Sequence, residues 1–229
     1  MSASRLLPFV CVLLAGPLAA QGLKPAPWSF SVSAGPVFGG PMGALEDLMI
    51  AQEWTGQYCD FRQSDCHQSP TPGGMSFQFS GSLARRLSGK LELKAVVEVG
   101  DLGQIIGAKD QREIKASWKT SSLGTALVLH PIPRVRLGAG PLIALLTRQT
   151  VPPAKNNSVH TGFLVEGGLR SSERASSFLE LVVSYRRLPR LPEGPWPGSG
   201  QSSQIIGGPT GFIADFSHVT VGLGGGVRF

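Results

Sequence analysis

The sequence is poor in charge, in cysteine and in long hydrophobic runs. Charged residues make up 16% of the 229 residues, against roughly 25% in soluble domains, while hydrophobic residues reach 41%. Disordered chains are rich in charge and poor in apolar residues, so this composition argues against a disordered chain. The formal charge is +6, but Lys and Arg are scattered rather than clustered, which argues against nucleic acid as a partner.

The N-terminal residues have the order of a secretory signal. Arg5 precedes an apolar run from Leu6 to Leu14, and small residues follow up to Ala20. The run falls short of the roughly 20 residues that a membrane-spanning helix needs. We expect residues 1–20 to be a signal peptide that is cleaved after Ala20, and residues 21–229 to form one domain.

The rest of the chain shows strand periodicity, with apolar and polar residues in alternation. The fourth of the expected strands is the weakest, because Ile114, Ala116 and Trp118 fall on the opposite parity from the residues after them. Either a bulge near Ser121 or a late start of the strand would account for this. Pro141, in the fifth, is unfavourable in mid-strand because it removes a ladder donor. The eight expected strands cover about residues 28–38, 75–87, 91–101, 123–129, 135–147, 160–170, 177–187 and 217–229.

The joints between these strands alternate between short and long. In an antiparallel meander, alternate joints lie at opposite ends, so the short turns share one rim and the long loops share the other. That layout is typical of outer-membrane barrels. The short joints are residues 88–90, 131–133 and 171–176, and the long ones are 39–74, 102–111, 148–159 and 188–216.

One face of each strand is nearly free of charge, and the other carries acids and bases in similar number. A soluble barrel would turn the charged face outward, whereas a membrane barrel would enclose it. Small residues on the polar face favour a narrow filled interior. The nine charged residues that we expect in the lumen are Glu92, Lys94, Glu98, Arg136, Glu166, Arg170, Glu180, Arg186 and Arg228.

Aromatic residues near the strand ends also favour a membrane barrel, because girdles of aromatics mark the two bilayer interfaces. The predicted fold class is therefore all-β, an eight-stranded antiparallel up-and-down transmembrane β-barrel with a filled lumen. A soluble exported barrel that binds an apolar ligand inside is the remote alternative. The aromatics are Trp28, Phe30 and Phe229 at the short-turn rim, and Phe38, Phe77, Phe163, Tyr185 and Phe216 at the long-loop rim.

The segment from Trp28 to Phe229 resembles the small eight-stranded outer-membrane β-barrel proteins of Gram-negative bacteria. The most specific part is the last strand, which ends on an aromatic after alternating apolar residues. In that family such a strand is read by the barrel-assembly machinery, and the matching residues here are Val221, Leu223, Val227 and Phe229. Gly225 departs from the apolar pattern.

The resemblance implies a place in the cell outer membrane, in contact with its lipid and with lipopolysaccharide. It also implies a non-enzymatic role without cofactors. That role is either structural in the envelope or the presentation of extracellular loops to a partner whose identity the sequence does not give.

Two cysteines, Cys59 and Cys66, lie in the first long joint. Exported proteins meet an oxidising compartment, so we expect a disulfide between them. Asp60, Asp65 and His67 lie beside them and allow a metal site to be imagined. The six residues between the cysteines exceed the two to four that are usual in thiolate zinc sites, which disfavours that alternative.

Two other functions compete with a plugged, non-catalytic barrel. The first is a narrow pore along the enclosed charges. The second is a lipid A-modifying enzyme that uses a His beside a hydroxyl at the outer rim. His218 near Ser217 and Thr220, and His160 near Ser158, are the candidates, although no local motif of such enzymes is matched.

The last long joint contains a Pro-rich segment with Trp196 among the prolines, and Arg186, Arg187 and Arg190 lie nearby at the outer rim. The arginines either pair with lipopolysaccharide phosphates or are ordinary solvated charges. Trp196 either contacts a partner or the membrane surface, or packs down on its own loop.

Overall fold

The computed structural model describes residues 28–54, 71–73, 76–109, 112–151, 154–172, 176–193 and 212–229. Within these ranges, no helix has the length and apolar character needed to cross a membrane. The predicted signal peptide, Cys59, Cys66 and Trp196 lie outside the described residues. The elements are β1 (Trp28–Gly39), α2 (Met42–Ala51), β2 (Thr71–Gly73), β3 (Phe77–Arg86), β4 (Leu91–Lys109), β5 (Arg112–Leu129), β6 (Val135–Val151), β7 (Ala154–Arg170), β8 (Ser177–Arg187), β9 (Arg190–Glu193), β10 (Phe212–Asp215) and β11 (His218–Arg228).

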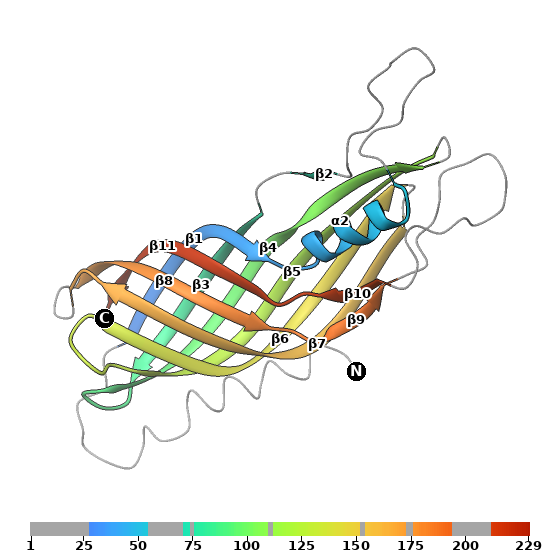
Figure 1. The fold of residues 1–229 in the computed structure, drawn as a ribbon. Coiled ribbons are helices and arrows are strands. Elements are labelled where there is room, and N and C mark those ends of the chain that lie inside the picture. Colours follow the sequence, from blue (N-terminus) through green and yellow to red (C-terminus); the bar gives the residue numbers. More distant parts are fainter. Residues whose placement is uncertain are drawn as a thin grey trace.

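Eight of these strands form a closed antiparallel ring in the order β1, β3, β4, β5, β6, β7, β8 and β11 (Figure 1). Each strand pairs with its neighbour along the chain, and β11 returns to pair with β1 from Ser29↔Arg228 to Gly39↔His218. Backbone hydrogen bonds between Trp28 and Phe229 close the seam, at 2.9 and 3.0 Å. The predicted up-and-down barrel is confirmed.

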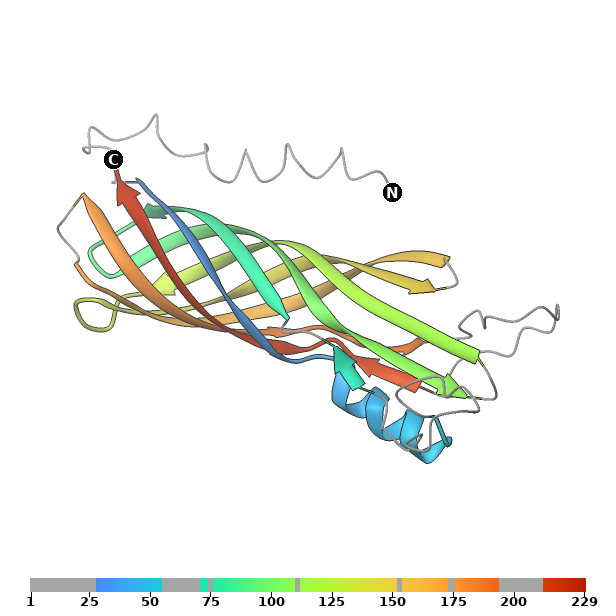
Figure 2. The same cartoon turned by 90° about the horizontal axis from the view of Figure 1, so that it is seen from above.

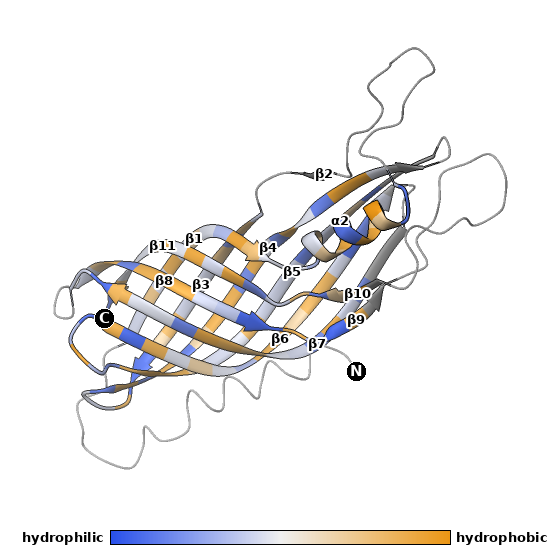
Figure 3. Ribbon diagram, viewed as in Figure 1, coloured by the Kyte–Doolittle hydropathy of each residue, from blue (hydrophilic) through white to orange (hydrophobic). Residues whose placement is uncertain are grey.

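Side chains alternate between the inside and the outside of the ring along every strand. In β8, for example, the exposed Leu179, Leu181 and Val183 alternate with the buried Glu180 and Val182. Figure 3 shows the corresponding alternation of hydrophobic and hydrophilic residues along the strands. The apolar face lies on the outside of the ring.

Four consecutive strands are much longer than the other four. Strands β4 to β7 have 19, 18, 17 and 17 residues, whereas β1, β3, β8 and β11 have 12, 10, 11 and 11. The β4–β5 and β6–β7 hairpins therefore continue past the other strands, at the end where α2 lies (Figures 1 and 2). The expectation that residues 102–111 and 148–159 are long loops was wrong, because most of them extend these strands. Residues 39–74 and 188–216 do form long connections.

Neither alternative for the fourth strand holds, because β5 begins at Arg112 and keeps a single parity over its described side chains from Lys115 to Leu129, without a bulge near Ser121. The irregularity lies in the neighbouring strand β4, where Asp101 pairs with Lys119 but Gly103 pairs with Trp118. Leu102 is the extra residue and points inward. Gly103 has a φ of 109° there, in the left-handed region that glycine tolerates, and its N–H donates to Asp101 Oδ1 at 2.8 Å.

The β5–β6 ladder is interrupted where β6 contains Pro141. The register runs from Gly124↔Leu142 to Leu127↔Ala139 and skips the positions between them. Gly140 fits this point because a Cβ there would lie 2.0 Å from the carbonyl oxygen of Thr125. On its other side β6 pairs with β7 without a break, so Pro141 is accommodated without ending the strand.

Candidate functional site

An uncharged apolar surface surrounds the ring, and we call it the apolar belt. Between Arg85 near the short turns and the level of Asp101, Lys119 and Arg187, none of the outward-facing described residues is charged. Beyond the belt, the outer faces of the long hairpins carry polar residues such as Lys115. The belt includes Phe30, Val32, Phe38, Phe77, Phe79, Val97, Val99, Leu127, Leu129, Leu137, Leu145, Phe163, Val165, Leu169, Leu179, Leu181, Val183, Tyr185, Leu223, Val227 and Phe229, all at least 39% exposed.

The lumen at the level of the belt holds an ion-pair network. Lys94 Nζ lies 2.9 and 2.8 Å from the two carboxylate oxygens of Glu166. Arg136 donates to Glu180 at 2.6 Å and to Glu92 at 3.3 Å. Arg170 Nε donates to the same oxygen of Glu180 at 3.1 Å, and its Nη1 lies 3.5 Å from Glu92. These residues come from four strands, β4, β6, β7 and β8, so the network joins walls that lie on opposite sides of the lumen.

A second ion pair lies nearer the long hairpins. Arg186 donates to both oxygens of Glu98, through Nη2 and, at 2.6 Å, through Nε. Its Nη1 donates to Ser184 Oγ at 2.8 Å and to Thr220 Oγ1 at 3.1 Å. Ser122 also donates to Glu98, at 2.9 Å. Each nitrogen of the Arg186 guanidinium and each oxygen of the Glu98 carboxylate therefore has a hydrogen-bond partner, as buried charge requires.

Arg228, the ninth expected lumen charge, stands apart from the network. It is only partly buried at the short-turn rim, where its Nη2 donates to the carbonyl oxygen of Ser172 at 3.0 Å. The guanidinium groups of Arg170 and Arg228 lie 4.3 and 5.0 Å from the ring centroid of the buried Phe178. The other eight expected charges are all buried to 7% exposure or less.

Little space remains between the charged groups. A cavity of about 20 Å3, lined by residues that include Gln78, Lys94 and Arg186, lies inside the polar lumen. That is room for about one water molecule. The lumen at this level is filled by its own side chains.

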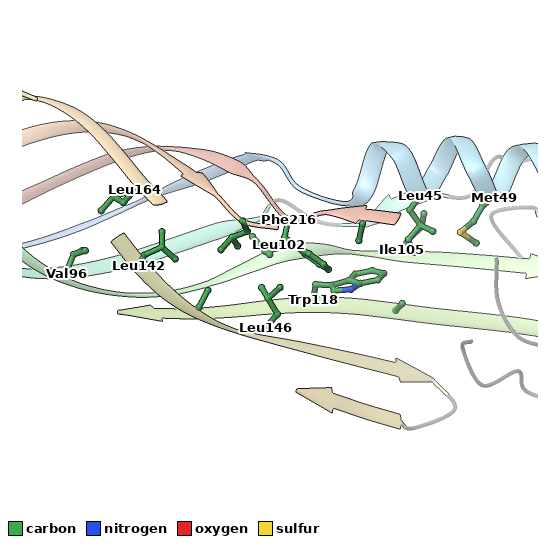
Figure 4. Packing of buried hydrophobic residues seen from close by; sticks show 14 of the residues in the cluster. Leu45, Met49, Val96, Leu102, Ile105, Trp118, Leu142, Leu146, Leu164 and Phe216 are labelled. Atoms are coloured by element: carbon green, nitrogen blue, oxygen red, sulfur yellow. The ribbon is translucent and has the colours of Figure 1, made fainter. Parts of the chain in front are cut away.

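Above the ion pairs, the interior becomes apolar. Leu45 and Met49 of α2 are fully buried against the inner face of the long hairpins, near Ile105 and Trp118 (Figure 4). The polarity of the wall thus reverses along the barrel axis, from apolar outside with charge inside to polar outside with an apolar core. Phe216, which we expected in the outer girdle, is 1% exposed and belongs to this core.

The candidate catalytic groups are engaged elsewhere or not aligned. His218 is 2% exposed, and its Nδ1 lies 2.9 Å from the carbonyl oxygen of Phe216. Thr220 donates to Gln78 at 2.6 Å, and the Ser217 hydroxyl donates to the carbonyl oxygen of Leu188 at 3.2 Å. Neither hydroxyl is bonded to His218.

The second pair, His160 and Ser158, shows no hydrogen bond between its members among the described residues. Their strand β7 places both side chains on the inner, partly buried face of the outer hairpin. Within the described ranges no group of three or more His, Cys, Asp or Glu residues is placed to hold a metal ion. Asp60, Asp65 and His67 lie outside those ranges.

Arg186, Arg187 and Arg190, which lie around the start of the last joint, face different ways. Arg186 points into the lumen, so it does not contact lipid. Arg187 faces outward and is exposed, and Arg190 has a side chain that is 75% exposed. Arg190 Nε donates to Asp215 at 3.1 Å.

Asp215, which precedes β11, has a lowered pKa. Partial burial acts to raise the pKa, but hydrogen bonds from Ser217 and Arg190 outweigh it. The Ser217 backbone N–H donates to Asp215 Oδ1 at 2.9 Å. These contacts fix the short connection between β10 and β11.

The residues expected to guide assembly lie on the outer face of β11. Leu223 is 68% exposed, Val227 48% and Phe229 70%, while Val221 is partly buried. All four belong to the apolar side of the strand beside the seam with β1.

A groove of about 650 Å3 opens on the outside where β8 ends, and we call it the rim groove. It lies between β7 and the β9–β10 hairpin. Its lining residues are Thr161, Gly162, Phe163, Tyr185, Arg187, Leu188, Pro189, Arg190, Asp215 and Ser217.

The chain is similar in fold to small outer-membrane β-barrel proteins. One such structure is Ail, the attachment invasion locus protein of Yersinia pestis, crystallised with the heparin analogue sucrose octasulfate. The match has 11% identity and a TM-score of 0.46, and it covers 90% of this chain and 100% of Ail. Another is the outer membrane protein AlkL in DMPC bilayers, at 15% identity and a TM-score of 0.42, covering 93% of this chain and 94% of AlkL. No protein-family model and no curated protein matches the sequence.

Several buried residues at the site were not singled out from the sequence. Trp118 of the apolar core fell on the unexpected parity, although inward apolar residues beyond the belt would produce that pattern. Leu102, in the same core, fell in a joint that was expected to be a loop. His130 follows β5, and its Nε2 lies 3.3 Å from Glu92 Oε2. Gln78 fell on the polar face, which was the only signal for its inward position.

Proposed function

We propose that the protein is an outer-membrane β-barrel with a sealed lumen, which holds a rigid platform outside the membrane and has no enzymatic activity. The reversal of wall polarity carries this proposal. An uncharged apolar exterior suits contact with lipid. Hairpins with a polar outer face and an apolar core inside suit surroundings of water. The four shorter strands, of 10 to 12 residues, also match the roughly 9–11 residues of a tilted membrane strand.

The proposed location includes export through a signal peptide that is removed after Ala20. An exported chain reaches an oxidising compartment, so the proposal also includes the Cys59–Cys66 disulfide. Intact mass of the purified protein tests both: we expect a chain that begins at Gln21 and is lighter by two hydrogen atoms than its reduced form. A chain that retains residues 1–20 in the membrane would contradict the export step.

The proposed role is to present the outer surface of the long hairpins, or to stabilise the envelope. The hairpins support presentation because α2 packs on their inner face, burying Leu45 and Met49 completely. Six or seven extra residues at about 3.3 Å each give roughly 20 Å of strand beyond the shorter neighbours. Such an element holds its shape without a bound partner.

A narrow pore is the alternative with the same location. The lumen argues against it, because the ion pairs leave a cavity of only about 20 Å3 and the apolar core lies above them. Planar-bilayer recording tests this: we expect a folded barrel without conductance steps. Reproducible steps that change with Glu98→Gln would establish the pore instead.

The membrane location has its own test. The folded protein should fractionate with the outer membrane and migrate faster on a gel before boiling than after it. Recovery as a soluble periplasmic protein would overturn the proposal. The absence of catalysis is tested with His218→Ala, which should leave lipopolysaccharide acylation unchanged.

A further inference from the structure

The rim groove lies where the apolar belt meets the first charged residues of the outer surface. Phe163 and Tyr185 belong to the belt and also line the groove, and they are 46% and 39% exposed. Arg187 is the residue opposite Phe163 in the β7–β8 register. The groove is therefore continuous with the belt at one end and basic at the other.

The two arginines of the groove are available to an anion. No hydrogen bond or ion pair joins the Arg187 side chain to another of the described residues. Arg190 uses Nε for its contact with Asp215, which leaves its two terminal amino groups. Asp215 accepts a hydrogen bond from Arg190 through one oxygen and from the Ser217 N–H through the other, so both carboxylate oxygens already have donors. The basic end thus retains a net positive charge.

The shape of the groove suits a ligand that is part lipid and part polar. Its volume of about 650 Å3 lies in the range of small-ligand sites, yet it opens sideways rather than into the lumen. An acyl chain could lie along Phe163 and Tyr185, and a phosphate at the level of Arg187 and Arg190 would accept charge-assisted hydrogen bonds. Thr161 and Asp215 also line the groove, and both carry groups that can bond sugar hydroxyls.

We propose that the rim groove binds a phosphorylated glycolipid of the outer leaflet, of the lipid A type. The sugar phosphate contacts Arg187 and Arg190, and an acyl chain packs on Phe163 and Tyr185. This inference rests on the proposed membrane location, and it adds a specific lipid site to a belt that would otherwise contact lipid only through its apolar surface.

The test measures lipid bound to the purified protein in detergent, by native mass spectrometry with titrated lipid. The probes are bisphosphorylated lipid A, the same glycolipid without phosphates, and phosphatidylglycerol. The variant is Arg187→Gln/Arg190→Gln. The matched control is Lys115→Gln/Lys119→Gln, which removes two positive charges from the outer face of β5, away from the groove.

We expect the arginine variant to bind lipid A at least about tenfold more weakly than the wild type, as expected for lost charge-assisted bonds. The control should bind as the wild type does. The dephosphorylated glycolipid should bind the wild type as weakly as lipid A binds the variant, and phosphatidylglycerol should also bind weakly.

Unchanged lipid A binding by the arginine variant would overturn the site, and so would an equal loss in the control. Phosphatidylglycerol bound as tightly as lipid A would overturn the role of the sugar headgroup. Each variant is also checked for outer-membrane fractionation and heat-dependent migration. A variant that inserts normally with unchanged lipid binding refutes this inference alone, whereas a wild-type protein outside the membrane refutes the proposed function.

Discussion

Lys94 and Glu166 face each other across the lumen, with the ammonium nitrogen 2.8 Å from the nearer carboxylate oxygen. They belong to β4 and β7, which are separated by two strands on the shorter path around the ring. Both side chains are 6% exposed or less. The pair therefore joins two walls that the backbone ladder connects only indirectly.

Glu166→Gln should destabilise the barrel by about 3–5 kcal/mol, because it leaves the Lys94 charge buried without its carboxylate. Urea unfolding of the protein in detergent, followed by the gel shift, gives the free energy. The double variant Lys94→Met/Glu166→Leu should recover most of the loss, since it removes both charges. Equal stability of Glu166→Gln and the wild type would show that this pair does not hold the walls together.

Neighbouring residues of β8 should report opposite environments. Val183 is 46% exposed on the apolar belt, and Ser184 is 4% exposed in the lumen. In vesicles, a cysteine at position 183 should react with a thiol probe dissolved in the lipid phase, and a cysteine at 184 should not. The reverse pattern would mean that the barrel encloses its apolar face.

A positive charge on the belt should be much worse tolerated than one beyond it. Val183→Arg should lower the free energy of unfolding in lipid by about 2–4 kcal/mol if that residue lies near the middle of the bilayer. Ser117→Arg, on the outer face of the β4–β5 hairpin, should have little effect. Similar losses for both variants would contradict the boundary drawn between belt and hairpin.

Gly140 and Gly81 form a pair for testing the break in the β5–β6 ladder. A Cβ at Gly140 would lie 2.0 Å from the backbone carbonyl of Thr125, whereas a Cβ at Gly81 meets nothing within 4 Å. Gly140→Ala should therefore cost about 1–3 kcal/mol through overpacking, and Gly81→Ala should be near neutral. The comparison is made by urea unfolding, and equal effects would argue against the close approach at Pro141.

The apolar core beyond the belt should stabilise the outer platform locally. Trp118 is 1% exposed in that core, while Leu129 on the same strand is 53% exposed in the belt. Trp118→Ala should expose the long hairpins and α2 to limited proteolysis, with the heat-dependent gel shift retained, because the cavity lies outside the ion-pair network. Leu129→Ala should leave the proteolysis unchanged. Resistance of Trp118→Ala would show that α2 is held by other contacts.

The ring and its faces could be predicted because the period of two is continuous at the level of the belt. Leu181 is apolar and lies on the outer face, whereas its neighbour Glu180 is charged and enclosed in the lumen. The short turns mark where each of these strands ends. The hairpin extensions could not be predicted in the same way. Their inner face is apolar around Trp118, so the pattern inverts without any change in backbone parity.

Three further features depend on contacts that the sequence does not display. The extra residue Leu102 lies within β4, in a segment that was expected to be a loop. Phe216 has the position of a girdle aromatic, but the Asp215–Ser217 connection turns the chain before β11 begins, so its ring enters the core. The helix α2 lies within a joint that looked like a loop, and it has no side-chain cap at its N-terminus.

The seam between β1 and β11 has a consequence for biogenesis. β1 pairs with β11, which is synthesised nearly two hundred residues later. Until the two strands pair, each has a sheet edge whose backbone hydrogen-bonding groups are unsatisfied. Closure therefore has to follow synthesis of the whole ring, and the pairing of such distant segments makes folding slow.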